Sequence, residues 1–526
     1  MISRVRLASL PVRLAALLGI ALAGCAAGPN YHAPKPDVPA AFVPEPSIDA
    51  AAVTPYDAAP LGATPAVSAV TDLAKWWRAL DDQELDSLIE RAIRGNPDLD
   101  IALTRLQQAR TYEAGIIGSA LPQIDATGAV GKGTGSDLSR GRAENALRSA
   151  DNSTGLQHLT TIGGFATVWE IDLFGKYRRE IEAARDEADA AASARRAAIT
   201  TLVADVARAY IDLRGLQVRS GVLHHAAELL RESLGIVKIR YERGITNELD
   251  VALAAREYGT LQAQIAPVDA QVAAAQYTLA ALLGEYPESL LQELKAPSLI
   301  PSVPAAASIG VPLQLLKRRP DIQLAERELA ASTARIGVAT ADLYPQVSLV
   351  AAIGAQAQDW GTTPNIGKHI WSFGPGAVWP VLDFGTLDAK VAIAHLATHV
   401  QLVNYRRTII NAVQEVDSAA AGYAAEQSRL KDLGDAMLAA QRAVDLANAR
   451  YDRGMTDFLN VVDAERQFYA LQEEYAAAQV AQDEEFVKLY KALGGGWENY
   501  QSVPAIPRPQ PAIVAAFRRA LSPASP

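Results

Sequence analysis

Hydrophobic residues recur every three or four positions along two unusually long stretches of the chain, residues 176–242 and 386–452, and neither stretch contains proline. This spacing is typical of a heptad seam, which is buried between packed helices. The seam residues are Ile199, Leu202, Val206, Ala209, Leu213 and Leu216 in the first stretch and Ile409, Ala412, Val416, Ala419 and Tyr423 in the second. Each stretch therefore predicts one helix, about 100 Å long at 1.5 Å per residue.

A short corner follows each long helix, and the two corners are nearly identical. They read RYERGIT from residue 240 and RYDRGMT from residue 450. Gly244 and Gly454 allow the left-handed backbone conformation that ends a helix and reverses the chain. A second alanine-rich helical pattern follows each corner, at 248–283 and 458–493. The pattern predicts two long antiparallel helical hairpins whose tips lie at these glycines.

Other segments alternate between large apolar and smaller or polar residues, which is typical of β-strands. The predicted strands cover about 123–131, 163–173, 345–356 and 371–383. A helical pattern at 84–118 precedes the first pair and is interrupted at Asn96-Pro97, because proline favours a helix boundary. The fold class expected from the sequence is therefore mixed α+β.

The two halves of the chain repeat one another. LPQI at 121–124 matches YPQV at 344–347, and VWEIDLFGK at 168–176 matches VWPVLDFGT at 378–386. The offset falls from 223 to 210 residues between these two pairs, so the first half carries 13 extra residues in the polar, glycine-rich loop 132–162. We expect one structural unit to occur twice, at 71–300 and 301–500.

The ends of the chain have a different composition. Residues 1–24 combine early arginines with a short apolar run, which is typical of a secretory signal peptide and too short to span a membrane. This run ends in LAGC, which resembles the bacterial lipoprotein box, so Cys25, the single cysteine of the chain, is the predicted lipidation site. Residues 25–70 are predicted to form an extended tether, and residues 501–526 a loosely ordered tail.

Charge and motifs exclude several function classes. A net charge of −10 argues against nucleic acid as the main partner. GAVGKGTGSD lacks the spacing of a phosphate-binding loop, and His395 and His399 have no third ligand nearby. We therefore expect no enzyme activity, no metal and no cofactor.

Four strands of about ten residues have the length to cross a bilayer but cannot close a barrel alone. Open sheet edges in lipid leave backbone groups unpaired, and bacterial barrels have even strand counts of eight or more. The long helices likewise call for lateral neighbours to bury their seams. Two or three copies must then share one barrel, and strand counting leaves dimer and trimer open.

Several motifs carry a resemblance to a known family. They are Cys25 with GPNY, Trp76-Trp77, KRRPDIQLAERELAASTARIGVATADLYPQVSL at 317–349, FGPGAVWPVLDFG at 373–385 and YKALGGGW at 490–497. The chain resembles the TolC-like outer-membrane factors, in the lipoprotein branch that serves resistance-nodulation-division efflux pumps. The resemblance implies an elongated homotrimer with a shared 12-stranded transmembrane β-barrel and a 12-helix periplasmic α-barrel.

The same resemblance implies the function. It is a passive outer-membrane exit duct for small molecules, anchored by lipid at Cys25, which extends into the periplasm and docks to an adaptor protein and an inner-membrane pump. A duct for type I protein secretion or heavy-metal export is an alternative, although the chain lacks the Met or His clusters expected of metal handling. A structural coiled-coil surface lipoprotein is a further alternative, which does not need the strands.

The resemblance also assigns roles to the hairpin tips. Acidic residues at or after the turns would line a periplasmic gate, with Asp463 at the constriction and Asn460 at a position where many relatives carry a second acidic residue. The gate residues are Asp250, Asp457, Asn460 and Asp463. Residues beside the two glycines would latch neighbouring hairpins together. The latch residues are Tyr241, Arg243, Gly244, Tyr451, Arg453 and Gly454.

Overall fold

The computed structural model describes residues 26–35, 39, 72–133, 158–304, 318–358 and 368–502. The chain forms two compact units. The sheet unit comprises Met1–Lys35, Gln108–Ala191 and Leu324–Arg406, and the hairpin unit comprises Pro36–Gln107, Ala192–Gln323 and Arg407–Pro526. Each unit therefore takes segments from both halves of the sequence, so the compact units do not follow the sequence repeats.

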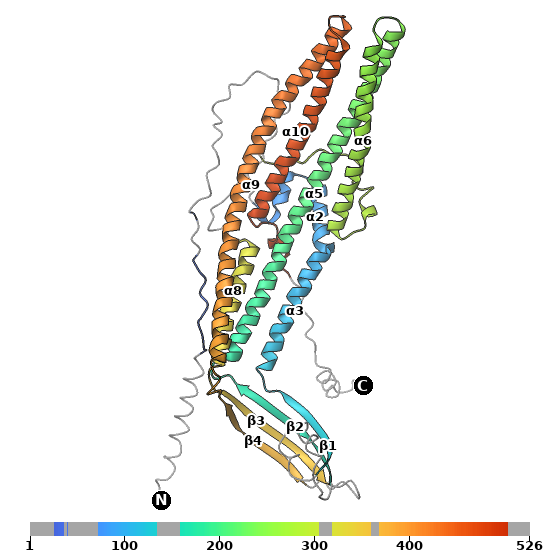
Figure 1. The fold of residues 1–526 in the computed structure, drawn as a ribbon. Helices are drawn as coiled ribbons and strands as arrows, with labels where there is room; N and C mark the ends of the chain where they lie inside the picture. Colours follow the sequence, from blue (N-terminus) through green and yellow to red (C-terminus); the bar gives the residue numbers. More distant parts are fainter. Residues whose placement is uncertain are drawn as a thin grey trace, which may run out of the picture. The chain divides into compact units, whose positions relative to one another are not determined.

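The sheet unit contains one four-stranded antiparallel sheet (Figure 1). Its strands are β1 (Ile124–Gly133), β2 (His158–Ile171), β3 (Gln346–Gln358) and β4 (Lys368–Val378). Each strand pairs with its neighbours in the order β1-β2-β3-β4. The two repeats therefore meet at the β2–β3 pair, and among the described residues β1 and β4 each have one edge without a partner strand.

The fourth strand is shorter at its end than the sequence predicted, because β4 stops at Val378 and not near residue 383. Pro380 lacks the N–H that a ladder needs. Asp383 instead accepts hydrogen bonds from the backbone of Gly385 at 3.2 Å and Leu387 at 2.7 Å, which starts the next helix. Strand β2 likewise ends at Ile171, two residues before the predicted end at residue 173.

One face of the sheet exposes a row of large apolar side chains. Phe165 on β2 lies opposite Ile353 on β3, which lies opposite Trp371 on β4. These side chains are 58%, 65% and 77% exposed, respectively. An exposed apolar patch of this kind marks a surface that another apolar phase or partner covers.

Four long helices form two antiparallel hairpins (Figure 1). The first hairpin consists of α5 (Lys176–Glu242) and α6 (Glu248–Leu283), and the second of α9 (Thr386–Asp452) and α10 (Phe458–Ala492). Helices α5, α6 and α9 have the bounds that the sequence indicated, and α10 ends one residue earlier. The pattern predicts them well because each is long and is followed by a turn with a glycine at positive φ.

Shorter elements complete the chain. They are η1 (Leu73–Leu80), α2 (Gln83–Gly95), α3 (Pro97–Ser119), η3 (Pro287–Ser289), α8 (Pro320–Ala341) and η4 (Glu498–Tyr500). The break between α2 and α3 falls at Asn96, whose side-chain oxygen accepts hydrogen bonds from the backbone N–H of Asp98 at 2.9 Å and Leu99 at 3.2 Å. This cap stabilises the helix start at Pro97, as the sequence predicted.

The main core of the hairpin unit buries both predicted seams inside a single chain. Ile199, Leu213 and Val416 are buried in it. The same core contains aromatic residues of the Trp76-Trp77 and YKALGGGW motifs. Trp76 stacks on Tyr490 with ring centres 5.8 Å apart. Much of both seams is therefore covered within one chain, by η1 and α2 together with residues of α6 and α10.

Several predicted features lie outside the described residues: the signal peptide, Cys25, most of the tether 25–70, the centre of the loop 132–162 and the tail after residue 502. They remain predictions. Within the described ranges, no helix has both the length and the apolar character that crossing a membrane requires.

Candidate functional site

Both hairpin tips have the same backbone geometry. In the first tip the N–H of Gly244 donates to the carbonyl of Tyr241 at 2.8 Å, and in the second the N–H of Gly454 donates to the carbonyl of Tyr451 at 2.9 Å. The glycine φ angles are +71° and +67°. Only glycine adopts this conformation without strain, and the hydrogen bonds satisfy carbonyl groups at the helix end. The repeated glycine thus explains why both hairpins turn alike.

The side chains around the two turns bond differently. In the first tip the hydroxyl of Thr246 donates to the carboxylate of Asp250, and Asn247 accepts the backbone N–H of Asp250 at 3.0 Å. In the second tip Asp457 precedes α10 without a side-chain capping bond, and Asn460 donates to the hydroxyl of Thr456 at 2.8 Å. The carboxylate of Asp250 is thus bonded within its own turn, whereas that of Asp457 is exposed.

One arginine joins the two tips. The guanidinium carbon of Arg240 lies 4.7 Å from the ring centre of Tyr451, and its nitrogen lies 3.3 Å from the carboxylate of Asp452. Cation–π contacts and ion pairs of this type each contribute a fraction of a kcal/mol to about 1 kcal/mol. Sequence reasoning missed Arg240, although it is the first arginine of the repeated RYERG motif.

An apolar cluster lies beneath this contact. We call it the tip cluster, and its buried residues are Val237, Ala254, Phe458, Val461 and Val462. These come from α5, α6 and α10, so the tip cluster packs both hairpins together. Tyr451 packs against it, with its ring centre 5.3 Å from that of Phe458. The ends of the two hairpins, at the top of Figure 1, therefore form one packed structure.

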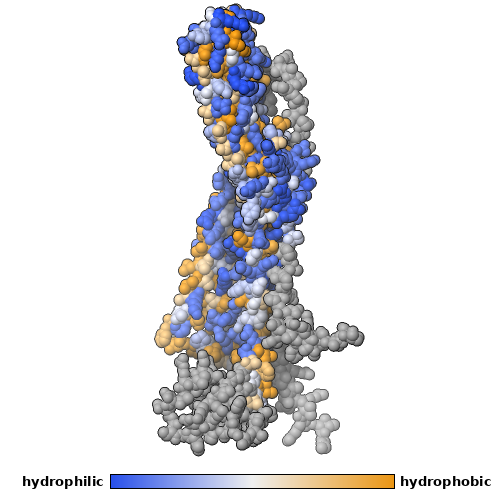
Figure 2. Space-filling model, turned by 90° about the vertical axis from the view of Figure 1, so that its right-hand side faces the viewer, coloured by the Kyte–Doolittle hydropathy of each residue, from blue (hydrophilic) through white to orange (hydrophobic). Residues whose placement is uncertain are grey.

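The predicted latch residues divide into two groups. Tyr451 takes part in the tip contact, and its hydroxyl oxygen is buried without a hydrogen-bond partner among the described atoms. Tyr241, Arg243 and Arg453 are exposed. On the face that Figure 2 shows, the tips carry mainly hydrophilic side chains with small hydrophobic patches between them. The structure thus brings one latch residue into the contact and leaves three at the surface.

Asp463 lies one turn into α10 and is paired within its own helix. Its carboxylate accepts a hydrogen bond from Arg466 at 2.7 Å, and the two side chains are 58% and 55% exposed. The nearby Glu465 is more deeply placed, and burial raises its pKa, with the charge of Glu257 adding to the effect. Burial together with Glu465 raises the pKa of Tyr469 to about 12. The tips therefore carry exposed charge and, behind it, a carboxyl whose pKa is raised by burial.

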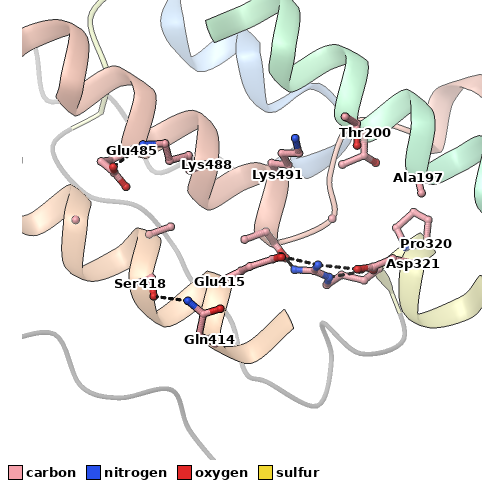
Figure 3. A pocket seen from close by; sticks show the side chains of 16 residues that line it. Ala197, Thr200, Pro320, Asp321, Gln414, Glu415, Ser418, Glu485, Lys488 and Lys491 are labelled. Atoms are coloured by element: carbon pink, nitrogen blue, oxygen red, sulfur yellow. Dashed lines mark hydrogen bonds and ion pairs between the residues drawn. The ribbon is translucent and has the colours of Figure 1, made fainter. Parts of the chain in front are cut away.

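A second polar region surrounds Arg319 in a hollow of about 620 Å³ (Figure 3). The guanidinium donates at 2.7 Å to the carboxylates of Asp321 and Glu415 and to the carbonyl of Ala492. These contacts explain the RRPDI motif as a structural joint that ties the start of α8 to α9 and α10. Lys488, which also lines the hollow, pairs with Glu485 at 2.7 Å, so its charge is also compensated.

Ser220, His224 and Asp269 lie together in the hairpin unit, but not in the arrangement of a catalytic triad. Asp269 accepts a hydrogen bond from Ser220 at 2.7 Å and lies 3.3 Å from His224. A nucleophilic serine must instead bond to the histidine that takes its proton. Over the ranges that the structure covers, no three His, Cys, Asp or Glu side chains converge as metal ligands, and His395 and His399 are exposed.

Comparison with known proteins gives matches along most of the chain. The model of the outer membrane efflux protein family matches residues 88–285 and 311–495. Nodulation protein T of Rhizobium leguminosarum bv. trifolii is 29% identical, over 90% of this chain and 95% of that protein. The toluene efflux pump outer membrane protein TtgF of Pseudomonas putida is 30% identical, over 93% of this chain and 98% of that protein. The solved structure of the outer-membrane channel OprN is 33% identical, with a TM-score of 0.77, and covers 91% of this chain and 100% of that one.

Proposed function

The chain belongs to the outer membrane efflux protein family, and from this premise we propose that it is the outer-membrane exit duct of a tripartite efflux system. In this role it passively conducts small molecules, delivered by a periplasmic adaptor and an inner-membrane pump, to the exterior. The proposal rests on one combination of features. A single chain carries both a sheet with an exposed aromatic face and two very long helical hairpins that end in polar tips.

The sheet supports a membrane-embedded role. The row formed by Phe165, Ile353 and Trp371 is large, apolar and exposed. Lipid hydrocarbon stabilises such a surface. It cannot form hydrogen bonds with the unpaired backbone N–H and C=O groups along the outer edges of β1 and β4. Pairing β4 of one copy with β1 of the next would satisfy both edges. Three copies of this four-stranded sheet would then supply the twelve strands of one closed barrel.

A helical surface supports the same assembly. Helix α9 carries apolar side chains that remain exposed in the single chain and follow a spacing of three, four or seven residues. They are Ile393, Leu396, Val400, Val403 and Ile410. A stripe with heptad spacing fits a neighbouring helix through knobs-into-holes packing. A second copy of the chain is the occupant that closed symmetry provides.

The hairpin tips would form the periplasmic gate of this duct. Three chains with two hairpins each place several carboxylates around one opening, and such a ring favours cations. Asp457 and Asp463 are exposed and therefore suited to this role, with Asp463 paired to Arg466 on its own helix, whereas Asp250 is less exposed and bonded within its turn. Tyr241, Arg243 and Arg453 are exposed at the tips and would latch neighbouring chains.

The amino-terminal sequence supports attachment to the outer membrane. Cys25 is the last residue of LAGC, which resembles a lipoprotein box, and acylation there would add a lipid anchor to the hold of the shared barrel. We therefore propose an outer-membrane, lipid-anchored location with the hairpins in the periplasm. The proposed role involves transport without a chemical step, so it includes neither enzyme activity nor a cofactor.

Single-channel recording in a planar bilayer tests the duct directly. The full-length purified protein should insert as a trimer and conduct ions in discrete steps, with a preference for cations. A surface lipoprotein that is only a coiled-coil scaffold would bind the bilayer but would not conduct ions. Complete absence of conductance by correctly folded, membrane-inserted protein would contradict the proposed function.

A further inference from the structure

Residues 26–31, directly after the predicted lipidation site, belong to the sheet unit and contact α5 and α8 there. The backbone N–H of Ala27 donates to the carbonyl of Phe174 at 2.8 Å. Arg179, whose side chain is only 4% exposed, donates from Nε to the carbonyl of Ala27 at 3.1 Å and from Nη2 to the side-chain oxygen of Asn30 at 2.7 Å. A guanidinium offers five N–H donors in a fixed plane, so one buried side chain binds several groups of the segment at once.

Two glycines allow the segment to approach the helix closely. Gly28 has a φ of +82°, and a Cβ on it would lie 2.5 Å from the Cα of Gly337 in α8. A Cβ on Gly337 would lie 2.7 Å from the carbonyl oxygen of Ala27. The nearest atoms around Gly28 belong to the backbone, which cannot rotate away as a side chain can, and a Cβ on Gly337 would also lie 2.7 Å from Cγ of Arg179. The contact therefore requires glycine on both sides.

The far end of the segment is held by a separate set of side chains. The hydroxyl of Tyr31 donates to Glu326 at 3.4 Å, and the guanidinium carbon of Arg327 lies 5.8 Å from the centre of the tyrosine ring. Arg327 is itself oriented by Asp186, which accepts its hydrogen bond at 3.0 Å. Contacts at both ends leave little freedom to the residues between them.

The internal repeat shows that these contacts are not a general feature of the junction between sheet and helix. Gly385 in the second half matches Gly175 in the first, so the junction itself occurs twice. However, Ala389 stands at the position that matches Arg179, and Ala114 at the position that matches Gly337. The chain therefore builds the socket once, on the side where its amino-terminal segment lies.

We propose that Arg179 and Gly337 form a socket that fixes the attachment point of the amino-terminal lipid beside the end of strand β2. The inference rests on the proposed lipidation of the residue before Ala26. Consecutive Cα atoms are about 3.8 Å apart, so the lipid is attached one residue step from the socket. Phe174 and Tyr344 stack there with ring centres 4.7 Å apart, and aromatic side chains are favoured at membrane interfaces.

Docking of residues 26–31 would restrict where the acyl chains enter the bilayer. An acyl group at the end of a free tether could enter the bilayer anywhere within reach of that tether. With residues 26–31 docked, the acyl chains enter next to the sheet, and lipid and sheet are held at one depth. Arg179 is thus a positioning residue for the anchor.

Limited proteolysis of lipidated full-length protein tests the socket. Chymotrypsin cleaves after Tyr31, which would release residues 25–31 as a lipopeptide that mass spectrometry identifies. We expect Arg179→Gln and Gly337→Ala each to raise the cleavage rate at least about tenfold, with acylation of Cys25 retained. Arg185→Gln is the matched control, because Arg185 lies on the same helix, is 65% exposed and pairs with Glu113 at 3.3 Å away from the segment.

Two further outcomes are decisive. Gly28→Ala changes only the docked segment, so it leaves the packing of α5 and α8 intact and should give the same release even where a helix variant fails to fold. Equal cleavage rates in wild type, Arg179→Gln and Gly28→Ala, all acylated and folded, would overturn the socket. A wild-type chain without acyl mass on Cys25 would instead overturn the proposed lipidation and, with it, the anchoring role.

Discussion

Arg240 at the end of the first long helix bonds to Asp452 at the end of the second, across 3.3 Å, while its guanidinium covers the ring of Tyr451. The two residues occupy different places in the repeated corner, since Arg240 begins one copy and Asp452 is the third residue of the other. The repeat thus provides a cation on one tip and an aromatic–acid pair on the other. This pairing makes the tip contact inside a single chain.

Arg240→Ala should loosen the contact between the hairpin tips. The loss of one cation–π contact and one partly exposed ion pair costs about 1–2 kcal/mol per chain. With three copies around one opening, the closed state should become less populated and single-channel conductance should rise. Arg231→Ala serves as the control, because Arg231 pairs with Glu228 inside α5. Identical conductance in wild type and Arg240→Ala would show that this contact does not restrict the opening.

The exposed latch residues should act between chains. Arg453→Ala combined with Tyr451→Phe removes the exposed cation of Arg453 and the buried hydroxyl of Tyr451, while the ring that Arg240 covers is kept. Charge-assisted hydrogen bonds contribute about 1.5–3 kcal/mol each when partly desolvated. We expect higher single-channel conductance in this double variant. The latch assignment fails if the variant opens no more than wild type does.

Asp463 and Arg466 should have opposite effects on ion selectivity. Asp463→Ala removes a carboxylate and leaves Arg466 unpaired, so cation preference should fall. Arg466→Ala frees the same carboxylate, so cation preference should rise. Reversal potentials under a salt gradient measure both effects. Shifts of the same sign in the two variants would place this pair away from the conducting path.

Arg319→Gln should destabilise the hairpin unit by about 2–3 kcal/mol, because a buried guanidinium loses charge-assisted bonds to Asp321 and Glu415. Chemical unfolding followed by circular dichroism measures the loss. Arg318→Gln is the matched control, since Arg318 is 40% exposed and pairs with Glu498 at 3.0 Å, and exposed pairs contribute about 0–1 kcal/mol. Equal losses in the two variants would contradict the structural role of the Arg319 network.

Asp483 should make stability depend on pH. Its side chain is 2% exposed, one of its oxygens finds no partner among the described atoms, and burial raises its pKa well above the usual range. The folded state therefore keeps the carboxyl proton of Asp483 to higher pH than the unfolded chain does. The stabilising effect of this proton is present in acid and is lost as pH rises.

Asp483→Asn removes this ionisation. The variant should be more stable than wild type at pH 7, by about 1–3 kcal/mol, and the difference should shrink towards pH 4. Thermal melts at several pH values provide the measurement. Asp205→Asn is the control, because Asp205 is partly exposed and pairs with Lys491 at 3.5 Å. A pH-independent difference would show that Asp483 does not titrate between these values.

Sequence patterns predicted the candidate site unevenly. Both tip glycines were readable from the repeat, because only one residue type suits a positive φ at a helix end. The role of Arg240 could not be predicted from the repeat, because the pairing of one corner with the other depends on how the two hairpins pack. Likewise, no local pattern distinguishes Asp250, bonded to Thr246, from Asp457, which is exposed.

The sequence by itself determined the elements. Helix bounds for α5 and α9 follow from a 3-4 periodicity without proline, those of α6 from an alanine-rich pattern between turn residues, and the strands from alternation. Tertiary structure decided which faces are covered. Trp76 and its neighbours bury the seam residue Ile199 within the chain, whereas Leu396 on α9 remains exposed, although both belong to similar patterns. Periodicity defines an apolar face, but only packing between segments distant in sequence determines what that face contacts.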